Sequence, residues 1–482
     1  MRSVAELLFR PASVVVYGAS SDPDKLSGRP LDYLKRFGYM GRIYAINNRH
    51  HQVQGVEAFP SIEEIPSRVD LAVVVVPAAS VVEAVSRCAG AGVGMAIVFA
   101  SGFAEIDAHG AELQRELKEV SRKTGIRILG PNCLGSFSLP TRTFATFSTA
   151  FDDDAKRNDS PIALVSQSGA VGTFTYSTMN SMGLGVRYFA NTGNQSDATA
   201  IELLGELVKQ DDVDLLLGHL EDLTHPEALR VLLQSAERLR KPFVILKAGA
   251  TEAGARAVNA HTASMAGDDR EFNDLVSEYG AIRVESMEAM ADAALAFVGG
   301  RRAKGNRVSI VTLSGGAGAI AADAAVGAGL CVDSWPEADQ ESLKAVLPDF
   351  GSSLNPVDVT GAMINEIGIL PRTLEVVAGH EGTDVLLVVL GNADKGGDEI
   401  VEALIGAYGA TTKPFLVSWT GGSGRPRSAL LEAGIPTFGD PVRAVRVIDR
   451  MVRYGGHAAR PASGPLHESI LRSGPPSGVG TA

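Results

Sequence analysis

Residues 13–20 read SVVVYGAS, a β-branched apolar run that stops at a glycine. A run of this kind predicts a strand buried on both faces and followed by a tight turn. Similar runs recur with helix-length segments between them: RIYAIN from Arg42, LAVVVVP from Leu71, MAIVFASG from Met95 and IRILGPN from Ile126. Alternation of buried strands with helices is typical of a doubly wound parallel sheet. We therefore expect a Rossmann-like α/β domain over residues 1–145.

Two further series of apolar runs follow. A polar stretch at 152–161 precedes IALVSQSGAV, GVRYFAN, VDLLLGHLE and PFVILKAG, and a basic stretch near residue 300 precedes RVSIVTLSGGAG, TDVLLVVLG and PFLVSWTGG. A chain of 482 residues is too long for one hydrophobic core. We therefore expect two more α/β domains, at 160–298 and 305–454. The remainder, 455–482, is rich in Pro, Gly and Ser, which predicts a disordered tail.

Composition excludes several classes of protein. The formal net charge of -12 disfavours nucleic acid binding, which needs clustered Lys and Arg. The three cysteines form no CxxC pair, and no HExxH spacing occurs, so we expect neither a disulfide framework nor a metal site. No stretch has the length of a membrane span or the pattern of a signal peptide. We therefore expect a cytoplasmic protein with no membrane contact.

The first turn, Gly18-Ala19-Ser20, has the composition of a phosphate-binding turn. Backbone N–H groups at such a turn and at a helix N-terminus can bind an anion. The full GxGxxG fingerprint is missing, however, and Asn47-Asn48 stands where an acidic ribose ligand would be expected. The sequence therefore favours CoA or another nucleotide over a nicotinamide cofactor, with a purely structural turn as the remaining alternative.

Two later stretches each close a predicted strand and open a predicted helix. Free N–H groups and hydroxyls there could hold a phosphoryl group, although glycines can also serve only close strand-to-helix packing. Their similarity suggests that the second and third domains are distant structural repeats. The candidate phosphate-binding residues are Ser166, Gln167, Ser168 and Gly169 in the first stretch and Ser314, Gly315, Gly316 and Gly318 in the second.

His261 lies in KAGATEAGARAVNAHTASMAGDD, where small residues dominate and few large apolar side chains could bury it. We interpret this stretch as a mobile loop. An imidazole is nucleophilic near neutral pH, and its phosphorylated form can pass the phosphoryl group on. A nucleophilic histidine needs a partner to fix its tautomer, and Glu221, at the end of a predicted strand, is the best placed carboxylate. An ordinary surface histidine and a solvated strand-end acid are the alternatives.

The ordered set of motifs resembles the NDP-forming acyl-CoA synthetase family, which includes ADP-forming acetate–CoA ligase and is related to succinyl-CoA synthetase. The resemblance covers roughly residues 4–450. Single motifs are weak, but their order is highly specific. The motifs are LLFRPASVVVYGAS, GYMGRIYAIN, VDLAVVVVP, ASGFAE, GPNCLG, SQSGAV, NTGNQSD, KAGATEAGARAVNAHTASMAG and NPVDVTG.

The resemblance implies a CoA-binding first domain and two flavodoxin-like ligase domains. It implies that an acid is activated as an acyl phosphate and captured by the CoA thiol, with His261 as the phosphohistidine and Glu221 as the residue that orients it. The two strand-to-helix stretches would act as paired helix dipoles around the phosphoryl group. The implied CoA contacts are Gly18, Ala19, Ser20, Pro77, Ser101, Phe103 and Asn132.

The chain departs from the family pattern at Ala263 and Asn48, and it contains no recognisable ATP-grasp segment. The resemblance therefore implies a separate ATP-grasp β subunit that binds ATP or ADP with Mg²⁺, in a homodimer or an α₂β₂ assembly. The implied substrates are a carboxylic acid or its acyl-CoA, CoA and phosphate, and the chain alone is expected to be inactive.

Two other functions compete with this one. A non-catalytic CoA- or acyl-CoA-binding regulatory protein is disfavoured by the presence of both His261 and Glu221, and an NAD-dependent oxidoreductase by the missing fingerprint. The sequence does not identify the acid, because a methylene changes selectivity by only about 1–3 kcal/mol. It also does not decide between ATP and GTP, because the nucleotide site is expected on another polypeptide.

Overall fold

The computed structural model describes residues 2–152, 158–221, 225–262, 268–364, 366 and 368–460, without the side chains of residues 260–262 and 364. Within these ranges the strands form three sheets. The chain divides into two compact units, the first mainly Met1–Asn180 with Leu184–Met290 and the second mainly Ala291–Ala462. None of the helices in these ranges is long and apolar enough to cross a bilayer.

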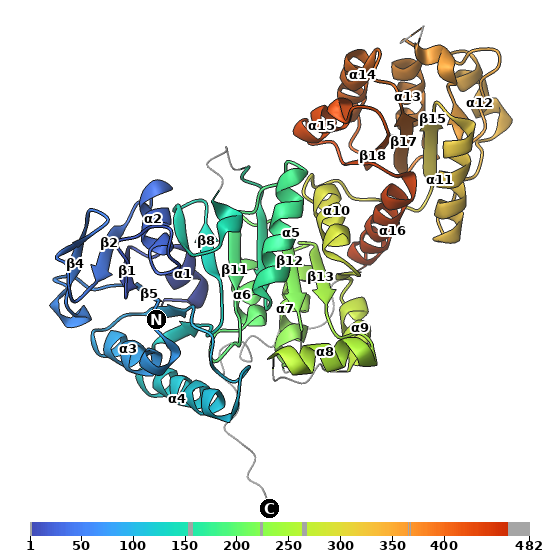
Figure 1. Cartoon of the computed structure of the whole chain (residues 1–482). Coiled ribbons are helices and arrows are strands. Elements are labelled where there is room, and N and C mark those ends of the chain that lie inside the picture. Colours follow the sequence, from blue (N-terminus) through green and yellow to red (C-terminus); the bar gives the residue numbers. More distant parts are fainter. Residues whose placement is uncertain are drawn as a thin grey trace, which may run out of the picture. The chain divides into compact units, whose positions relative to one another are not determined.

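The first sheet has the strand order β3-β4-β2-β1-β5-β6-β7 and is parallel except for β3. Chain order reverses on the two sides of β1, so β1 and β5 border the switch point where ligands bind in open α/β sheets. Helices α3 and α4 pack against each other beside this sheet (Figure 1). The elements are α1 (Val4–Phe9), β1 (Ser13–Tyr17), α2 (Arg29–Arg36), β2 (Arg42–Ile46), β3 (Gln52–Val53), β4 (Val56–Phe59), β5 (Leu71–Val74), α3 (Ala78–Gly90), β6 (Met95–Val98), α4 (Ala108–Thr124) and β7 (Arg127–Leu129).

The second sheet has the order β14-β13-β12-β10-β11-β8-β9. Its parallel part is extended by an antiparallel hairpin of β8 and β9, which pairs with β11 and brings residues 135–146 into this sheet. The elements are β8 (Gly135–Ser138), β9 (Thr143–Thr146), β10 (Ile162–Ser166), α5 (Gly169–Ser181), β11 (Tyr188–Asn191), α6 (Ala200–Leu207), β12 (Leu215–Leu220), α7 (Pro226–Arg238), β13 (Phe243–Lys247), α8 (Glu252–Thr262), α9 (Asp269–Glu278), β14 (Ile282–Val284) and α10 (Met287–Phe297).

Helix α1 ties the start of the chain to the second sheet. One apolar core runs from Val14 and Leu71 of the first sheet to Leu216 of the second and includes the buried side chains of α1. The N–H groups of Val4 and Ala5 donate to the Glu206 carboxylate at 3.3 and 2.6 Å, so a side chain from α6 satisfies N–H groups that α1 itself cannot.

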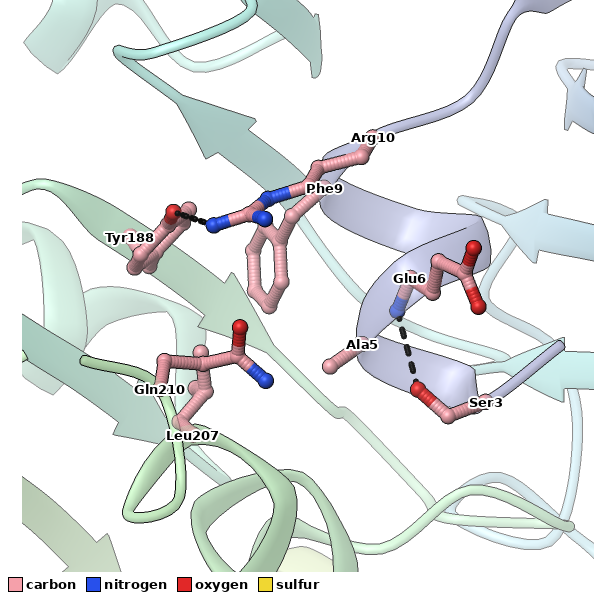
Figure 2. Close-up of a pocket in the computed structure, with 8 residues that line it drawn as sticks. All are labelled: Ser3, Ala5, Glu6, Phe9, Arg10, Tyr188, Leu207 and Gln210. Atoms are coloured by element: carbon pink, nitrogen blue, oxygen red, sulfur yellow. Dashed lines mark hydrogen bonds between the residues drawn. The ribbon is translucent and has the colours of Figure 1, made fainter. Parts of the chain in front are cut away.

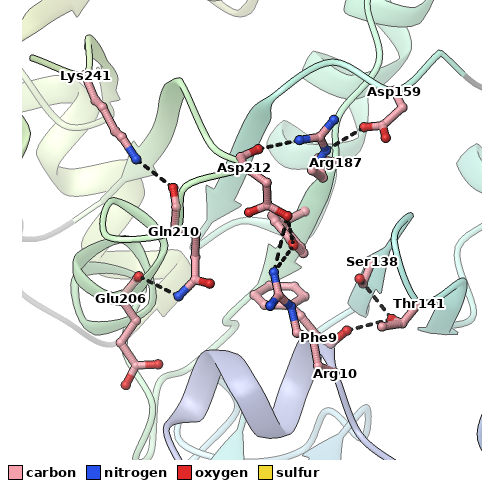
Figure 3. Close-up of polar contacts among 11 residues, drawn as sticks. Phe9, Arg10, Ser138, Thr141, Asp159, Arg187, Glu206, Gln210, Asp212 and Lys241 are labelled. Carbon is pink, nitrogen blue, oxygen red and sulfur yellow. Dashed lines mark hydrogen bonds and ion pairs between the residues drawn. The ribbon is translucent and has the colours of Figure 1, made fainter. Parts of the chain in front are cut away.

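A polar cluster follows α1 directly (Figure 3). Arg10 Nη2 donates to Tyr188 Oη at 2.9 Å and lies 3.2 Å from Asp212 Oδ2, which also accepts from Tyr188 at 2.7 Å. A hollow of about 250 Å³ lies beside it (Figure 2), and none of its lining residues is a predicted site residue. They are Ser3, Ala5, Glu6, Phe9, Arg10, Tyr188, Leu207 and Gln210.

The third sheet, in the second unit, is wholly parallel, with the order β16-β15-β17-β18-β19, and has its own core. The α/β fold with parallel sheets is thus confirmed. Helix α16 continues to Ala458, past the predicted start of the tail, and residues 461–482 lie outside the described ranges. The elements are β15 (Val308–Thr312), α11 (Gly315–Gly327), α12 (Glu337–Lys344), β16 (Val357–Asp358), α13 (Ile369–Gly379), β17 (Val385–Gly391), α14 (Gly397–Ala410), β18 (Phe415–Thr420), α15 (Arg425–Glu432), β19 (Thr437–Phe438) and α16 (Pro441–Ala458).

Candidate active site

The turn after β1 lies at the switch point of the first sheet. Gly18 has φ +92°, and a Cβ there would lie 3.0 Å from Val76 Cγ1 and 3.4 Å from the Val75 carbonyl oxygen, so the turn closely approaches the end of β5. Pro77 is the N-cap residue of α3. The turn and a helix N-terminus therefore meet at one edge, but that N-terminus belongs to α3, because α2 begins only at Arg29.

The remaining predicted CoA contacts follow β6 and β7 at the same edge of the sheet. Ser101 is exposed and Asn132 is half-buried with φ +56°. Phe103 is different, because its side chain is fully buried in the apolar core behind the sheet. The whole residue is 0% exposed and its backbone N–H donates to Glu105, so Phe103 presents no surface to a ligand in this structure.

Glu105 and Asn194 fix the loop that carries Ser101, although the sequence did not mark either as functional. Glu105 Oε1 accepts from the N–H groups of Gly102 at 2.7 Å and Phe103 at 3.2 Å, and Glu105 Oε2 accepts from Asn194 Nδ2 at 2.6 Å. Burial alone would raise the pKa of Glu105, but these hydrogen bonds bring the pKa below its ordinary value. In the sequence, Glu105 and Asn194 were marked only by their places in the motifs ASGFAE and NTGNQSD, respectively.

The loop after β10 forms the N-terminus of α5. The carbonyl oxygen of Ser168 accepts from Gly172 N at 3.1 Å, which makes Ser168 the N-cap residue, and Ser168 Oγ accepts from Val171 N at 3.4 Å. Within the described part of the chain, the N–H groups of Gly169 and Ala170 have no acceptor, as expected in the first turn of a helix. These two N–H groups can receive an anion, as the sequence predicts for this loop.

Gln167 and Glu221 lie side by side, although the sequence assigned them different roles. Gln167 Oε1 accepts a short hydrogen bond from the backbone N–H of Glu221, and Gln167 N donates to the His219 carbonyl oxygen at 3.1 Å. The side chain of Gln167 therefore holds the strand end that bears Glu221, which is itself 9% exposed directly after β12. The candidate phosphate loop and the candidate orienting acid thus meet at one edge of the sheet.

His261 belongs to α8, and its backbone is helical where a mobile loop was expected. Its side chain, and Ala263, lie outside the described residues. The ends of the segment from β13 to α9 are joined by the buried Lys247, whose Nζ lies 3.7 Å from Asp269 Oδ1, and Asp269 also pairs with Arg283 at 2.6 Å. This ion cluster closes the base of the segment that carries His261.

The loop after β15 repeats the geometry of the loop after β10. Ser314 is the N-cap residue of α11, its Oγ accepts from Ala317 N at 3.5 Å, and its carbonyl oxygen accepts from Gly318 N at 2.9 Å. Gly315 and Gly316 are exposed, whereas Gly318 is buried, and a Cβ there would lie 2.8 Å from Thr312 Cγ2. Gly318 therefore serves close helix-to-strand packing, and the preceding residues form the open N-terminus.

No group of three or more His, Cys, Asp or Glu side chains in the described ranges is arranged to hold a metal ion. Within the first unit, the candidate groups are the N-termini of α3 and α5, hydroxyls, amides and the buried carboxylate of Glu221. Such groups can bind an anionic phosphoryl group and stabilise its charge while it is transferred to or from a nucleophile.

Family models match segments of all three sheets. A CoA binding domain matches residues 12–137, a succinyl-CoA ligase-like flavodoxin domain matches 159–297 and a ligase-CoA domain matches 308–373. Together with the parallel sheets and the two phosphate-type loops, these matches define the class as a CoA ligase of the succinyl-CoA synthetase type.

Relatives of known name narrow this class. ADP-forming acetate–CoA ligase I of Archaeoglobus fulgidus is 34% identical over 94% of this chain, which spans 64% of that relative. The α subunits of ADP-forming acetate–CoA ligases I and II of Pyrococcus furiosus are 30% and 32% identical, and the matches cover 98% and 94% of those subunits. The chain belongs to the ADP-forming acyl-CoA synthetase family, which confirms the resemblance found in the sequence.

Solved structures agree with this assignment. Acetyl-coenzyme A synthetase 1 of Ca. Korarchaeum cryptofilum, solved in complex with phosphate and ADP, superposes with a TM-score of 0.86 at 28% identity. The match covers 95% of this chain and 98% of that one. The chain therefore shares the fold of this family over nearly its whole length.

Proposed function

We propose that this chain is the CoA- and phosphoryl-handling subunit of an ADP-forming acyl-CoA synthetase, which converts acid, CoA and ATP reversibly to acyl-CoA, ADP and phosphate. The observation that carries the proposal is the open N-terminus of α5 at the edge of the sheet where Glu221 follows β12. An N-terminus with free N–H groups stabilises a phosphoryl group through the helix dipole, and a neighbouring carboxylate can hold an imidazole in the required tautomer.

In the proposed mechanism, an imidazole nitrogen of His261 takes the γ-phosphoryl group of ATP and releases ADP. The phosphoryl group then passes to the carboxylate of the acid, which forms an acyl phosphate and frees the histidine. The CoA thiolate attacks the acyl carbon, the bond to the phosphate oxygen breaks, and phosphate leaves. Glu221 orients His261, and the N–H groups of Gly169 and Ala170 stabilise the charge on the phosphoryl oxygens.

CoA is proposed to bind at the switch point of the first sheet. The exposed Ser101 loop, the Gly18 turn, Pro77 at the start of α3 and Asn132 lie at the carboxyl ends of neighbouring strands. This is the edge where open parallel sheets bind nucleotides. Gly18 allows the close backbone approach that a pyrophosphate needs.

The nucleotide and Mg²⁺ are proposed to bind on a separate ATP-grasp β subunit, in an α₂β₂ assembly. The support comes from the two Pyrococcus furiosus relatives named as α subunits, which this chain matches over nearly their full length. We expect no ligase activity from the purified chain alone and activity after addition of a cognate β subunit. Full ATP-dependent activity of the single chain would contradict this part of the proposal.

The decisive experiment incubates the chain with a cognate β subunit and ATP labelled in the γ-phosphate, without acid or CoA, because an acid would take the phosphoryl group from the histidine. We expect acid-labile, base-stable label on the wild type and none on His261→Ala. His109→Ala, which removes an exposed histidine of α4, is the matched control and should be labelled normally. Absence of label on the wild type with a β subunit shown to be competent would instead favour a regulatory CoA-binding function.

A further inference from the structure

A buried histidine outside the proposed reaction stands behind the phosphate loop. His219 on β12 is 2% exposed and lies directly opposite Ser166 across the β10–β12 pair. Its Nδ1 is 3.3 Å from Ser166 Oγ, and Ser166 Oγ is 2.5 Å from the carbonyl oxygen of Ser168. These contacts form a chain from the imidazole to the N-cap residue of α5.

The distances show which atom donates the proton in each of these two hydrogen bonds. Two oxygens 2.5 Å apart require a proton between them, and a carbonyl oxygen has none to give, so the Ser166 hydroxyl donates to Ser168. The hydroxyl oxygen can then only accept from His219, which requires a proton on Nδ1. His219 is therefore expected as the Nδ1–H tautomer.

The third sheet provides an internal comparison. Thr312 at the end of β15 also places its hydroxyl on the N-cap carbonyl two residues later, with Oγ1 2.9 Å from Ser314 O, and the same hydroxyl lies 3.1 Å from the Val389 carbonyl oxygen. In the register of β15 with β17 the residue opposite Thr312 is Val389, so valine occupies the position that His219 occupies in the second sheet. In the third sheet, Thr312 Oγ1 accepts a hydrogen bond from the backbone N–H of Ser314 at 3.0 Å instead. His219 thus supplies the donor that the backbone supplies in the other loop.

We propose that His219 is a positioning residue for phosphoryl transfer: its Nδ1–H holds the Ser166 hydroxyl on the Ser168 carbonyl, which leaves the N–H groups of Gly169 and Ala170 open to the phosphoryl group. The inference rests on the proposed function for the identity of that group. His219 itself does not touch the substrate. The hydrogen-bond chain is a property of the fold and can be tested separately.

The burial of His219 is consistent with this role. Removal from water lowers the pKa of His219 to about 4, so the imidazole is neutral at physiological pH and has one proton to place. A neutral ring that donates from Nδ1 can fix the loop without adding a charge beneath a site that must accept and release an anion.

Three substitutions of His219 distinguish the effect of its Nδ1–H donor from the effect of the volume of its ring. Asn at position 219 places an amide nitrogen near the position of Nδ1, Gln places it near Nε2, and Val copies the residue opposite Thr312. With a competent β subunit and acetyl-CoA, ADP and phosphate as substrates, we expect His219→Gln and His219→Val to raise the KM for phosphate at least about tenfold. His219→Asn should stay within about threefold of wild type, and the KM for acetyl-CoA should change little in all three.

A KM for phosphate in His219→Gln or His219→Val within about threefold of His219→Asn would overturn the proposal, because the imidazole would then only fill space. Melting temperatures of the amide pair, Asn and Gln, identify effects that come from folding alone.

Selective ¹⁵N labelling of histidine in the wild-type chain provides a second readout that needs neither activity nor a folded variant. We expect the His219 signals of a neutral ring with the proton on Nδ1 between pH 6 and 8. An Nε2–H tautomer would overturn the proposal even if the ligase is active. Conversely, an Nδ1–H tautomer in a chain that shows no phosphoryl chemistry with a competent β subunit would uphold the hydrogen-bond chain and refute the proposed function.

Discussion

Asn194 donates from Nδ2 to Glu105 Oε2 at 2.6 Å and so joins the loop after β11 to the loop after β6. Glu105 in turn holds the N–H groups of Gly102 and Phe103, next to the predicted CoA contact Ser101. Asn194 also accepts from Asn132, another predicted CoA contact, at 3.2 Å. One side chain from the loop after β11 therefore holds two loops at the proposed CoA site of the first sheet.

This arrangement predicts a specific double-mutant result. Glu105→Gln sets two amide groups against each other, and Asn194→Asp sets two carboxylates against each other, so each change should raise the KM for CoA about five- to tenfold. The double variant, with carboxylate and amide exchanged, should recover part of the loss, because the hydrogen bond from Asn194 Nδ2 to Gln114 Oε1 at 2.9 Å is not restored. Steady-state kinetics at varied CoA measures the coupling. Strictly additive effects of the two changes would show that the contact does not position the loops.

Replacement of Gly193 by alanine should destabilise the protein more than the same replacement of Gly55, although both glycines have positive φ. Gly193 has φ +53°, and a Cβ there would lie 2.3 Å from the Pro131 carbonyl oxygen, whereas Gly55 has φ +78° with no atom within 4 Å of its Cβ position. Gly55→Ala should cost about 1 kcal/mol through the left-handed conformation alone. Gly193→Ala adds a collision with backbone and should cost at least about 3 kcal/mol. Thermal unfolding of both variants tests the prediction, which fails if their melting temperatures are equal.

The ion cluster at the base of the His261 segment predicts asymmetric effects of removing its partners. Lys247→Met removes a buried ammonium group with little change of shape and leaves Asp269 paired with Arg283, so we expect less than about 1 kcal/mol of destabilisation. Asp269→Asn removes the carboxylate 3.7 Å from that buried ammonium and should destabilise by about 2–4 kcal/mol.

Urea-induced unfolding compares these two variants. Equal losses would contradict the predicted asymmetry between the two partners of this 3.7 Å pair. Phosphate incorporation into His261 should slow in both variants, because the base of the segment is loosened in each.

His219 predicts a dependence of stability on pH. Burial lowers its pKa to about 4, from an ordinary value of 6.5, so the unfolded chain takes up this proton at a higher pH than the folded chain. The contribution of His219 is therefore fully present above pH 6.5 and is lost as the pH falls toward 4, by about 1.4 kcal/mol for each pH unit. Urea unfolding of the wild type and His219→Asn at pH 7, 6 and 5 measures the difference. A difference that stays constant over this range would contradict the prediction.

Most of the fold could be predicted from the sequence. SVVVYGAS forms β1 and its turn, IALVS forms β10, and SIVT lies within β15, because a strand buried on both faces needs a continuous apolar run and its end needs residues that can turn. The loops at Ser168 and Ser314, where α5 and α11 begin, were also predictable. In each of them the strand end, the N-cap residue and the first helical turn are neighbours in sequence. The motif order also determined the family.

Contacts between distant segments were decided only by the tertiary structure. Helix α1 packs on the second sheet, Phe103 lies in the core, and Asn194 reaches Glu105, although the motifs containing these residues were recognised. His219 lies in the apolar run VDLLLGHLE and has no sequence signal for a role of its own, yet the register of β12 with β10 places it opposite Ser166. Local sequence determines which segments become strands and where they end. The partners of a side chain depend on strand register and on packing between elements far apart in sequence, and these are fixed only when the whole core closes.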